Sequence, residues 1–241
     1  MKILLIVPSY NEEKNVLNNY NKILKYSKNC EYSVDAIIID DGSIDETKSI
    51  CIQNKIPHIS LINNLGIGGA VQTGYKYAYE NDYDIAIQFD GDGQHDVNYI
   101  EKIINPIIEK KCDMTIGSRF IDKNSSEFKS SFFRRIGINI ISFFIKLKTG
   151  FKIYDTTSGF RAVNKEIIKE FALDYPSEYP EPISSVSIIK KHFKIMEIPV
   201  SMNERKTGTS SIKNWKKAYY MLNVILSIVF TKFGGKKWVQ I

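Results

Sequence analysis

Short apolar runs rich in β-branched residues alternate with helix-like segments along the first half of the chain. The apolar runs cover residues 3–7, 34–39, 59–62, 85–89 and 114–116. Runs of this length are typical of buried strands, and their alternation with helices favours a parallel sheet covered on both faces. We therefore expect an α/β fold with a mostly parallel central sheet and flanking helices.

After residue 119 this alternation stops and a long amphipathic segment follows. It predicts a helix over about 131–148, on which Arg135, Asn139, Ser142 and Lys146 form one narrow polar line. The rest of that helix surface is apolar, so this helix is expected to lie at an interface.

A second helix of the same design is predicted from residue 212 to about residue 232. Between the two helices we expect a polar loop at 155–161, a short helix near 164–171, a helix ending at 192 and a strand at 195–200. Because no repeat or linker is found, we expect one main domain over 1–211, followed by an amphipathic C-terminal helix and tail at 212–241.

The formal net charge of +6 is unevenly distributed along the chain. Segments 128–154 and 205–241 together contain 14 Lys and Arg residues and no acidic residue, whereas the rest has 19 basic and 27 acidic residues. This pattern does not describe a general nucleic-acid binder, so no nucleic-acid partner is expected. Because both basic segments contain a predicted amphipathic helix, they favour an anionic membrane surface as partner.

Polar residues follow four of the predicted strands, in segments 8–12, 40–43, 90–95 and 117–119. In a parallel sheet these carboxyl ends lie at one edge, which is where ligands bind. Any single segment could be an ordinary strand-to-helix turn, since Asp, Asn, Ser and Gly are common turn residues. Four of them at one edge favour a binding site.

The segment after the fourth strand has the pattern of a metal site. Asp90, Asp92 and Gln94 alternate, which in extended chain places their side chains on one side, while Gly91 and Gly93 allow close approach. Carboxylate and amide oxygens are hard ligands that suit Mg²⁺ or Mn²⁺ bound together with a diphosphate.

Two other interpretations of these segments fit less well. Segment 90–101 has acids at positions one, three and twelve of an EF-hand calcium loop, but His95 stands where that loop needs glycine. The glycine-rich segment 64–71 has Val71 at the sixth position of GxGxxG, so a dinucleotide site is weakly supported. We interpret its glycines as a helix start that lets the backbone approach a neighbour or a phosphate.

Seven segments together carry a resemblance to a known family. They are IVPSYNEE (6–13), IDDGSIDET (39–47), NLGIGGA (64–70), FDGDGQH (89–95), GSR (117–119), DTTSGFR (155–161) and RKTGTS (205–210). In this order they resemble family 2 glycosyltransferases of GT-A fold, and within them the polyprenol-phosphate, or dolichol-phosphate mannosyltransferase-like, group. The resemblance makes residues 1–211 a GT-A catalytic domain.

The resemblance implies a role for residues in most of these segments. Nucleotide contacts would come from Pro8, Tyr10, Glu12, Ile38, Asp40, Asp90 and Gly91. The metal would be held by Asp90, Asp92 and Gln94, catalysis would involve Asp92, Arg119 and Arg205, and the acceptor phosphate would meet Ser131, Arg134 and Arg135. Arginine suits such roles because it stays charged and binds phosphate through two parallel hydrogen bonds. Where the group usually shows RxxGxSK, this chain has Ser211 instead of the lysine, so Lys206 or Lys213 would replace it.

The reaction that the resemblance implies is inverting, metal-dependent transfer of a sugar from UDP or GDP to a polyprenyl phosphate. A phosphate acceptor is already anionic near neutral pH and needs no general base. If the acceptor is instead a sugar hydroxyl, a carboxylate must take its proton, and Glu178 and Glu181 are the candidates. Nucleotidyl transfer and non-enzymatic nucleotide binding are the remaining alternatives. For a nucleotidyltransferase we would expect a loop with Gly and Arg after the first strand, and segment 9–13 contains neither.

We expect the protein to act at the cytoplasmic face of a membrane, as a peripheral protein. The longest apolar run, at 218–230, is shorter than the roughly 20 residues of a membrane span. Cys30, Cys51 and Cys112 are widely spaced, which favours reduced packing residues in a cytoplasmic setting. A second copy of the chain or a membrane protein is a further expected partner.

Overall fold

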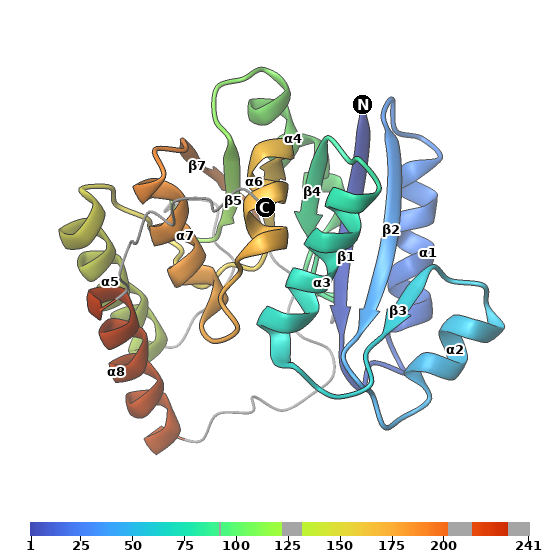
Figure 1. The fold of residues 1–241 in the computed structure, drawn as a ribbon, viewed down its shortest axis with the longest axis horizontal. Coiled ribbons are helices and arrows are strands. Elements are labelled where there is room, and N and C mark those ends of the chain that lie inside the picture. Colours follow the sequence, from blue (N-terminus) through green and yellow to red (C-terminus); the bar gives the residue numbers. More distant parts are fainter. Residues whose placement is uncertain (92, 122–131, 202–213, 231–241) are drawn as a thin grey trace, which may run out of the picture.

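The computed structural model of the protein describes residues 1–91, 93–121, 132–201 and 214–230 (Figure 1). Within these ranges, seven strands form one sheet in the order β3-β2-β1-β4-β6-β5-β7. The strands are β1 (Lys2–Ser9), β2 (Ser33–Asp40), β3 (His58–Ser60), β4 (Ile85–Gln88), β5 (Met114–Ser118), β6 (Arg161–Asn164) and β7 (Ile195–Pro199). The expected strands near 3–7, 34–39, 59–62, 85–89, 114–116 and 195–200 are all confirmed.

One strand, β6, was not expected from the sequence. It runs antiparallel between β4 and β5, with Arg161 opposite Gln88 on one side and Ile116 on the other. The predicted polar loop at 155–161 therefore ends one residue too late. Because β6 lies between them, β4 and β5 are not neighbours, and the two site loops that follow these strands are separated by one strand.

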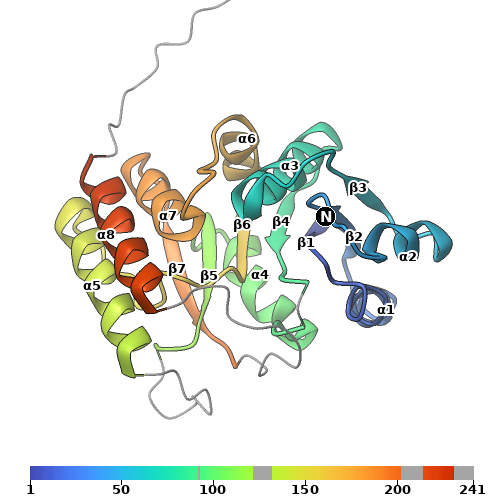
Figure 2. The ribbon, with the colours of Figure 1, turned by 90° about the horizontal axis from the view of Figure 1, so that it is seen from below.

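Helices cover both faces of the sheet (Figure 2). They are α1 (Val16–Ser27), α2 (Thr47–Gln53), α3 (Gly66–Glu80), the 3₁₀ turn η1 (Val97–Tyr99), α4 (Ile100–Ile108), α5 (Phe132–Thr149), α6 (Lys165–Leu173), α7 (Pro180–Lys190) and α8 (Asn214–Phe230). Alternate residues of β1 supply the two cores: Leu4 and Ile6 belong to the same core as residues of α3, α5, α6, α7 and α8, whereas Ile3 and Leu5 belong to the core that contains residues of α1, α2 and α4. The two-sided burial explains why these strands are apolar throughout.

The two amphipathic helices α5 and α8 pack against each other and against α7. Val224 and Ile228 of α8 are fully buried in the same core as Ile141 and Ile145 of α5. The polar line expected on α5 is only partly exposed, because Ser142 is buried. One face of α8 is therefore part of the main core.

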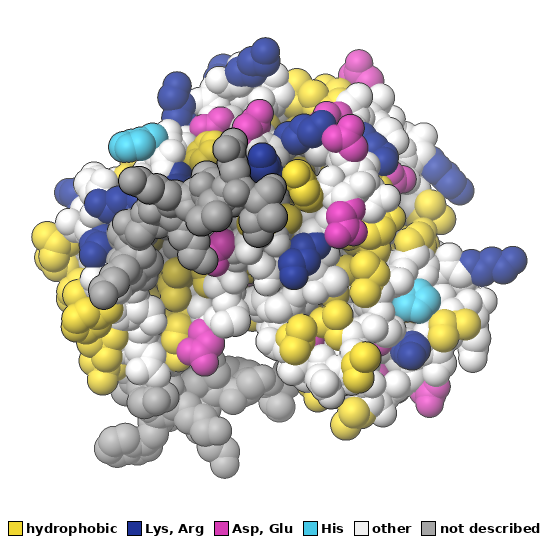
Figure 3. All heavy atoms as spheres, in the orientation of Figure 1, with side chains coloured by type: hydrophobic (Ala, Val, Ile, Leu, Met, Phe, Trp, Pro, Cys, Tyr) yellow, Lys and Arg dark blue, Asp and Glu magenta, His cyan; other side chains and the backbone are white. Residues whose placement is uncertain are grey.

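The outer faces of these two helices carry apolar side chains that face solvent. We call this surface the apolar ridge; it consists of Ile136, Ile140, Phe143 and Leu147 on α5 and Leu222, Leu226, Val229 and Phe230 on α8. Figure 3 shows hydrophobic side chains gathered at the left edge, over these helices. Within the described ranges, none of the helices combines the length and apolar character of a membrane span.

Candidate active site

The loops that follow β1 and β2 are joined by side-chain hydrogen bonds. The backbone N–H of Asn11 donates to Ser43 Oγ (3.0 Å), the Asn11 side chain accepts from the N–H of Ile44 (3.0 Å), and the N–H of Glu12 donates to Thr47 Oγ1 (2.8 Å). These bonds fix segment 9–13 against segment 41–47. Tyr10 stays exposed at this edge, whereas Pro8 is buried.

The two adjacent aspartates at the end of β2 have different surroundings. Asp40 is buried beside the end of β1 and accepts a hydrogen bond from the N–H of Ser43 (3.0 Å). Asp41 accepts from the N–H of Leu65 (2.8 Å), at the start of α3, and burial raises the pKa of its carboxyl. Asp41 thus anchors α3, which leaves Asp40 as the better candidate for the nucleotide. Ile38, expected beside it, is fully buried in the core below.

The glycine-rich start of α3 serves packing. A Cβ atom on Gly68 would collide with the backbone oxygens of Pro176 and Ser177, in the loop before α7. Of the two reasons expected for these glycines, close approach to a neighbour is the one found at Gly68.

The loop after β4 contains Asp90 and Gln94, and we call it the Asp90 loop. It is held tightly against β1 and α1. The Asn19 side chain of α1 donates a hydrogen bond to the Gly91 carbonyl, and a Cβ atom on Gly91 would lie 2.8 Å from Ser9 Oγ. Gly93 has a φ of +79°, in the left-handed region that favours glycine. These contacts fix the path of the loop from which Asp90 and Gln94 project, and they place it beside the β1 end.

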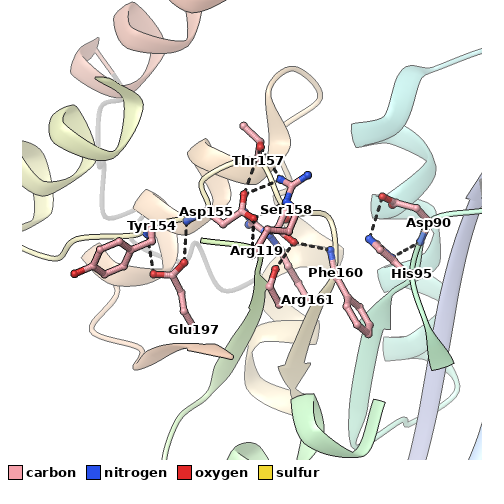
Figure 4. Close-up of polar contacts among 11 residues, drawn as sticks. Asp90, His95, Arg119, Tyr154, Asp155, Thr157, Ser158, Phe160, Arg161 and Glu197 are labelled. Carbon is pink, nitrogen blue, oxygen red and sulfur yellow. Dashed lines mark hydrogen bonds and ion pairs between the residues drawn. The ribbon is translucent and has the colours of Figure 1, made fainter. Parts of the chain in front are cut away.

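His95 closes this loop by contacting its first residue (Figure 4). The backbone N–H of Asp90 donates to His95 Nδ1 (2.9 Å), and His95 Nε2 lies 3.3 Å from Asp90 Oδ2. In a neutral imidazole the nitrogen that accepts carries no proton, so the proton is on Nε2 and faces the carboxylate. The ring is buried and stacks on Phe160 (4.6 Å between centroids). His95 therefore fixes the orientation of Asp90 through contacts with both its backbone and its carboxylate.

A buried arginine follows the end of β5. Arg119 Nε donates to Asp155 Oδ2 (2.7 Å) and Nη2 donates to Asp155 Oδ1 (2.8 Å) and to Thr157 Oγ1 (3.1 Å) (Figure 4). Arg119 is 6% exposed and Asp155 is fully buried. A bidentate pair of this kind fixes the plane of the guanidinium group.

Glu197 of β7 holds the backbone next to this pair. Its carboxylate accepts the backbone N–H groups of Tyr154 (2.7 Å) and Asp155 (2.8 Å). Burial raises the pKa of Glu197, while these two hydrogen bonds act in the opposite direction. Neither Asp155 nor Glu197 was assigned a role from the sequence. The available signal was that Asp155 is the first residue of the segment DTTSGFR (155–161), one of those that carry the family resemblance.

The two candidate bases differ in their surroundings. Glu178 is exposed, whereas Glu181, in the first turn of α7, is half-buried close to Arg161 and Asp90. Burial raises the pKa of Glu181, and the positive charge of Arg161 opposes that rise. Arg161 itself is buried and donates to the Glu181 carbonyl (2.8 Å). The electrostatic interaction of Glu181 with Asp90 places its carboxyl near the loop after β4.

Polar loops follow β1, β2, β4 and β5 at one edge of the sheet, and a comparison of sequences agrees with this arrangement. Residues 4–171 match the family described as Glycosyl transferase family 2. The chain belongs to this family. It is 37% identical over 218 residues to UDP-N-acetylglucosamine--dolichyl-phosphate N-acetylglucosaminyltransferase of Methanococcus voltae, covering 82% of this chain and 84% of that one. It is 22% identical over 221 residues to polyprenol monophosphomannose synthase of Mycolicibacterium smegmatis, covering 88% and 81%.

Solved structures place this family 2 glycosyltransferase in the GT-A fold. Glucosyl-3-phosphoglycerate synthase of Mycobacterium tuberculosis, in complex with Mn²⁺, UDP-glucose and phosphoglyceric acid, superposes with a TM-score of 0.69 at 16% identity. The match covers 94% of this chain and 79% of that one. The expected fold class is therefore confirmed, and the protein is a glycosyltransferase with relatives named for polyprenyl-phosphate acceptors.

In this glycosyltransferase, two residues of the Asp90 loop that the structure describes are suited to bind a divalent cation. Asp90 and Gln94 offer a carboxylate and an amide oxygen from one short loop. A Cβ atom on Gly159 would lie 2.9 Å from Asp90 Oδ1, so the glycine keeps the space at this carboxylate open. Over the described ranges no cluster of three His, Cys, Asp or Glu side chains forms a metal site by itself.

Several residues expected at the site lie outside the described part of the chain. These are Asp92, Ser131 and Arg205, together with the side chain of Arg134. Arg135 is described: it is half-buried on α5, and its guanidinium carbon lies 4.5 Å from the centre of the Phe120 ring. The structure thus brings Arg135 next to the residue that follows Arg119.

Proposed function

We propose that this glycosyltransferase moves a sugar from a UDP-sugar to the phosphate of a polyprenyl phosphate, with inversion at the anomeric carbon. The observation that carries the proposal is the 37% identity to the Methanococcus voltae enzyme, whose name gives a UDP-N-acetylglucosamine donor and a dolichyl-phosphate acceptor. UDP-N-acetylglucosamine is therefore the first donor to test, ahead of GDP-sugars.

The donor would lie along the edge formed by the ends of β1, β2 and β4. Asp40, Tyr10 and Glu12 would face its nucleoside, and its diphosphate would lie at the Asp90 loop. A Mg²⁺ or Mn²⁺ ion held by Asp90, Asp92 and Gln94 would supply positive charge for the leaving diphosphate. His95 would keep the Asp90 carboxylate oriented, because its Nε2–H faces that group.

The bond changes in this reaction balance without a proton acceptor. An oxygen of the acceptor phosphate forms a bond to the anomeric carbon while the bond from that carbon to the UDP oxygen breaks, and the bonding electrons leave with UDP. A phosphate monoester carries about 1.5 to 2 negative charges at pH 7, so its oxygen is already nucleophilic. Arg119, Arg135 and Arg205 would bind the phosphates of donor and acceptor.

The proposal includes peripheral binding to an anionic, cytoplasmic membrane surface. It rests on the apolar ridge of α5 and α8 and on the basic segments 128–154 and 205–241 that contain these helices. An amphipathic helix with an exposed apolar face and nearby Lys and Arg binds at the boundary between headgroups and acyl chains. This position would present the phosphate of a polyprenyl chain to Arg135, at the start of α5.

A second candidate is transfer to a sugar hydroxyl, with Glu181 as base. The observation that favours it is the raised pKa of the Glu181 carboxyl next to the Asp90 loop, since a base with a pKa closer to neutrality accepts protons better. The raised pKa also follows from burial alone, so we rank this candidate second.

The proposed function is tested by incubating the purified protein with UDP-N-acetylglucosamine, UDP-glucose or GDP-mannose, each with Mn²⁺ or Mg²⁺ and a polyprenyl phosphate. Mass spectrometry should detect a polyprenyl phosphate that carries one sugar, formed with a UDP-sugar and lost on addition of EDTA. Absence of this product from all donors, together with transfer to a glycan hydroxyl, would support the second candidate instead.

A further inference from the structure

Two arginines, Arg119 and Arg135, each have their guanidinium group over the ring of Phe120. The guanidinium carbon of Arg119 is 5.2 Å from the centre of the Phe120 ring, and that of Arg135 is 4.5 Å from it. The two cations come from different elements, the end of β5 and the start of α5, so they share this ring although they are 16 positions apart in the sequence.

The surroundings of Phe120 differ from those of an ordinary core residue. Its side chain is only 6% exposed, yet it belongs to neither of the two hydrophobic cores. A cation over an aromatic face is attracted by the ring's quadrupole, and the attraction is stronger where water is excluded. The buried ring, with both guanidinium groups close to it, can therefore help to fix their positions.

The two arginines differ in how their charge is balanced. Arg119 is paired with Asp155 through two hydrogen bonds, so its charge is matched and its position fixed. Among the described residues, no carboxylate lies within ion-pair distance of Arg135, and its side chain is half-buried on α5. A partly buried cation without a carboxylate partner attracts an anionic ligand.

We infer that Phe120 is a positioning residue for the acceptor phosphate: its ring holds the Arg135 guanidinium close to Arg119, so that Arg135 binds the phosphate. The inference rests on the proposed polyprenyl-phosphate acceptor and goes beyond it, because it selects Arg135 from the pair Arg134 and Arg135 and names the residue that aims it. Phe120 acts through Arg135 and takes no part in bond changes.

The test compares Phe120→Leu, which keeps an apolar side chain but removes the aromatic face, with Phe120→Tyr, which keeps the face. Phe120→Leu should raise the KM for polyprenyl phosphate by about five- to tenfold, with the KM for the UDP-sugar within about twofold of wild type. Phe120→Tyr should stay close to wild type. An equal rise in both KM values, or equal effects of the two variants, would overturn the inference.

A double-mutant cycle separates positioning from a general packing effect. In an Arg135→Gln background, Phe120→Leu should change the acceptor KM by less than about twofold, because the group that the ring positions is gone. Additive effects of the two substitutions would contradict the inference, even if Phe120→Leu also lowers the thermal unfolding temperature.

A direct binding measurement tests the role of Phe120 without depending on turnover. Isothermal titration with farnesyl monophosphate should show binding to wild type and about five- to tenfold weaker binding to Phe120→Leu. If wild type binds this probe, Phe120→Leu binds it more weakly and no glycolipid is made, the proposed function fails and the inference stands. If wild type makes glycolipid and Phe120→Leu binds the probe as wild type does, the inference fails and the function stands.

Discussion

Asp155 binds Arg119 through both of its carboxylate oxygens, and one of these oxygens also accepts the backbone N–H of Arg119 (3.1 Å). The pair is buried, and Glu197 holds the Asp155 backbone from the adjacent strand β7. The position of a candidate phosphate-binding guanidinium is therefore set by a carboxylate 36 residues away in the sequence, supported by a second carboxylate 42 residues further on.

Removing this carboxylate should damage both stability and activity. Asp155→Ala leaves a buried guanidinium without its partner, and we expect the free energy of unfolding to fall by about 3 to 5 kcal/mol in urea titrations followed by circular dichroism. Turnover of the folded fraction should fall by about 100-fold, since small displacements of a catalytic group have effects of this size. The exposed ion pair Lys111–Glu109 is the matched control: Glu109→Ala should unfold near the wild-type midpoint. Similar midpoints for both variants would show that the buried pair contributes little.

The fold could largely be predicted because buried parallel strands leave a strong sequence signal. Strands such as β1 are apolar throughout since both of their faces are covered, and Leu4 and Ile3 pack into different cores. The strand β6 has only four residues and begins with Arg161, whose charged side chain resembles a continuation of the preceding polar loop. Its place between β4 and β5 depends on pairing partners that are distant in the sequence.

The candidate site was predictable where its residues lie at or directly after the ends of parallel strands. Asp40 and Asp90 lie at the same sheet edge because strand ends gather there, as expected. Asp155, Glu197 and Phe120 act on arginines through contacts that only folding brings together, and a single sequence does not show such contacts. Ser142 shows a further limit: it fits a polar line on α5, yet tertiary packing buries it.

Substitution of Gly159 tests whether the space beside the Asp90 carboxylate is needed for metal binding. In Gly159→Ala the new Cβ atom would lie 2.9 Å from both Asp90 Oδ1 and Gln88 Nε2, so the carboxylate must shift. We expect the Mn²⁺ concentration that gives half-maximal activity to rise by about tenfold, which corresponds to about 1.4 kcal/mol of lost binding. In the control Gly137→Ala, on helix α5, the new atom meets only the flexible side chain of Met221. That variant should keep the wild-type metal dependence, and an equal rise in the two variants would argue against a specific role of Gly159.

The apolar ridge should make membrane binding sensitive to polar substitution. Replacing Leu222 and Leu226 together by Ser removes two exposed leucines from α8, and we expect co-flotation with vesicles containing phosphatidylserine to fall by about tenfold or more. Binding by wild type should also weaken at high salt, because part of the attraction is electrostatic. Ile62 is 97% exposed in the connection between β3 and α3, so Ile62→Ser is the matched control. Equal flotation of both variants would show that the ridge does not meet the membrane.

The pH dependence of turnover distinguishes the two acceptor classes. Burial raises the pKa of Glu181, so in a hydroxyl-transfer reaction the rate would rise as this carboxyl loses its proton, and Glu181→Gln would lower kcat by about 100- to 10,000-fold. With a phosphate acceptor, the rate should instead follow the second ionisation of the phosphate, at a pH of about 6. Glu181→Gln should then keep the shape of the pH profile and lower kcat by less than about tenfold, since the acceptor oxygen needs no base. A profile that loses its acidic limb in Glu181→Gln would identify Glu181 as the proton acceptor and a sugar hydroxyl as the acceptor group.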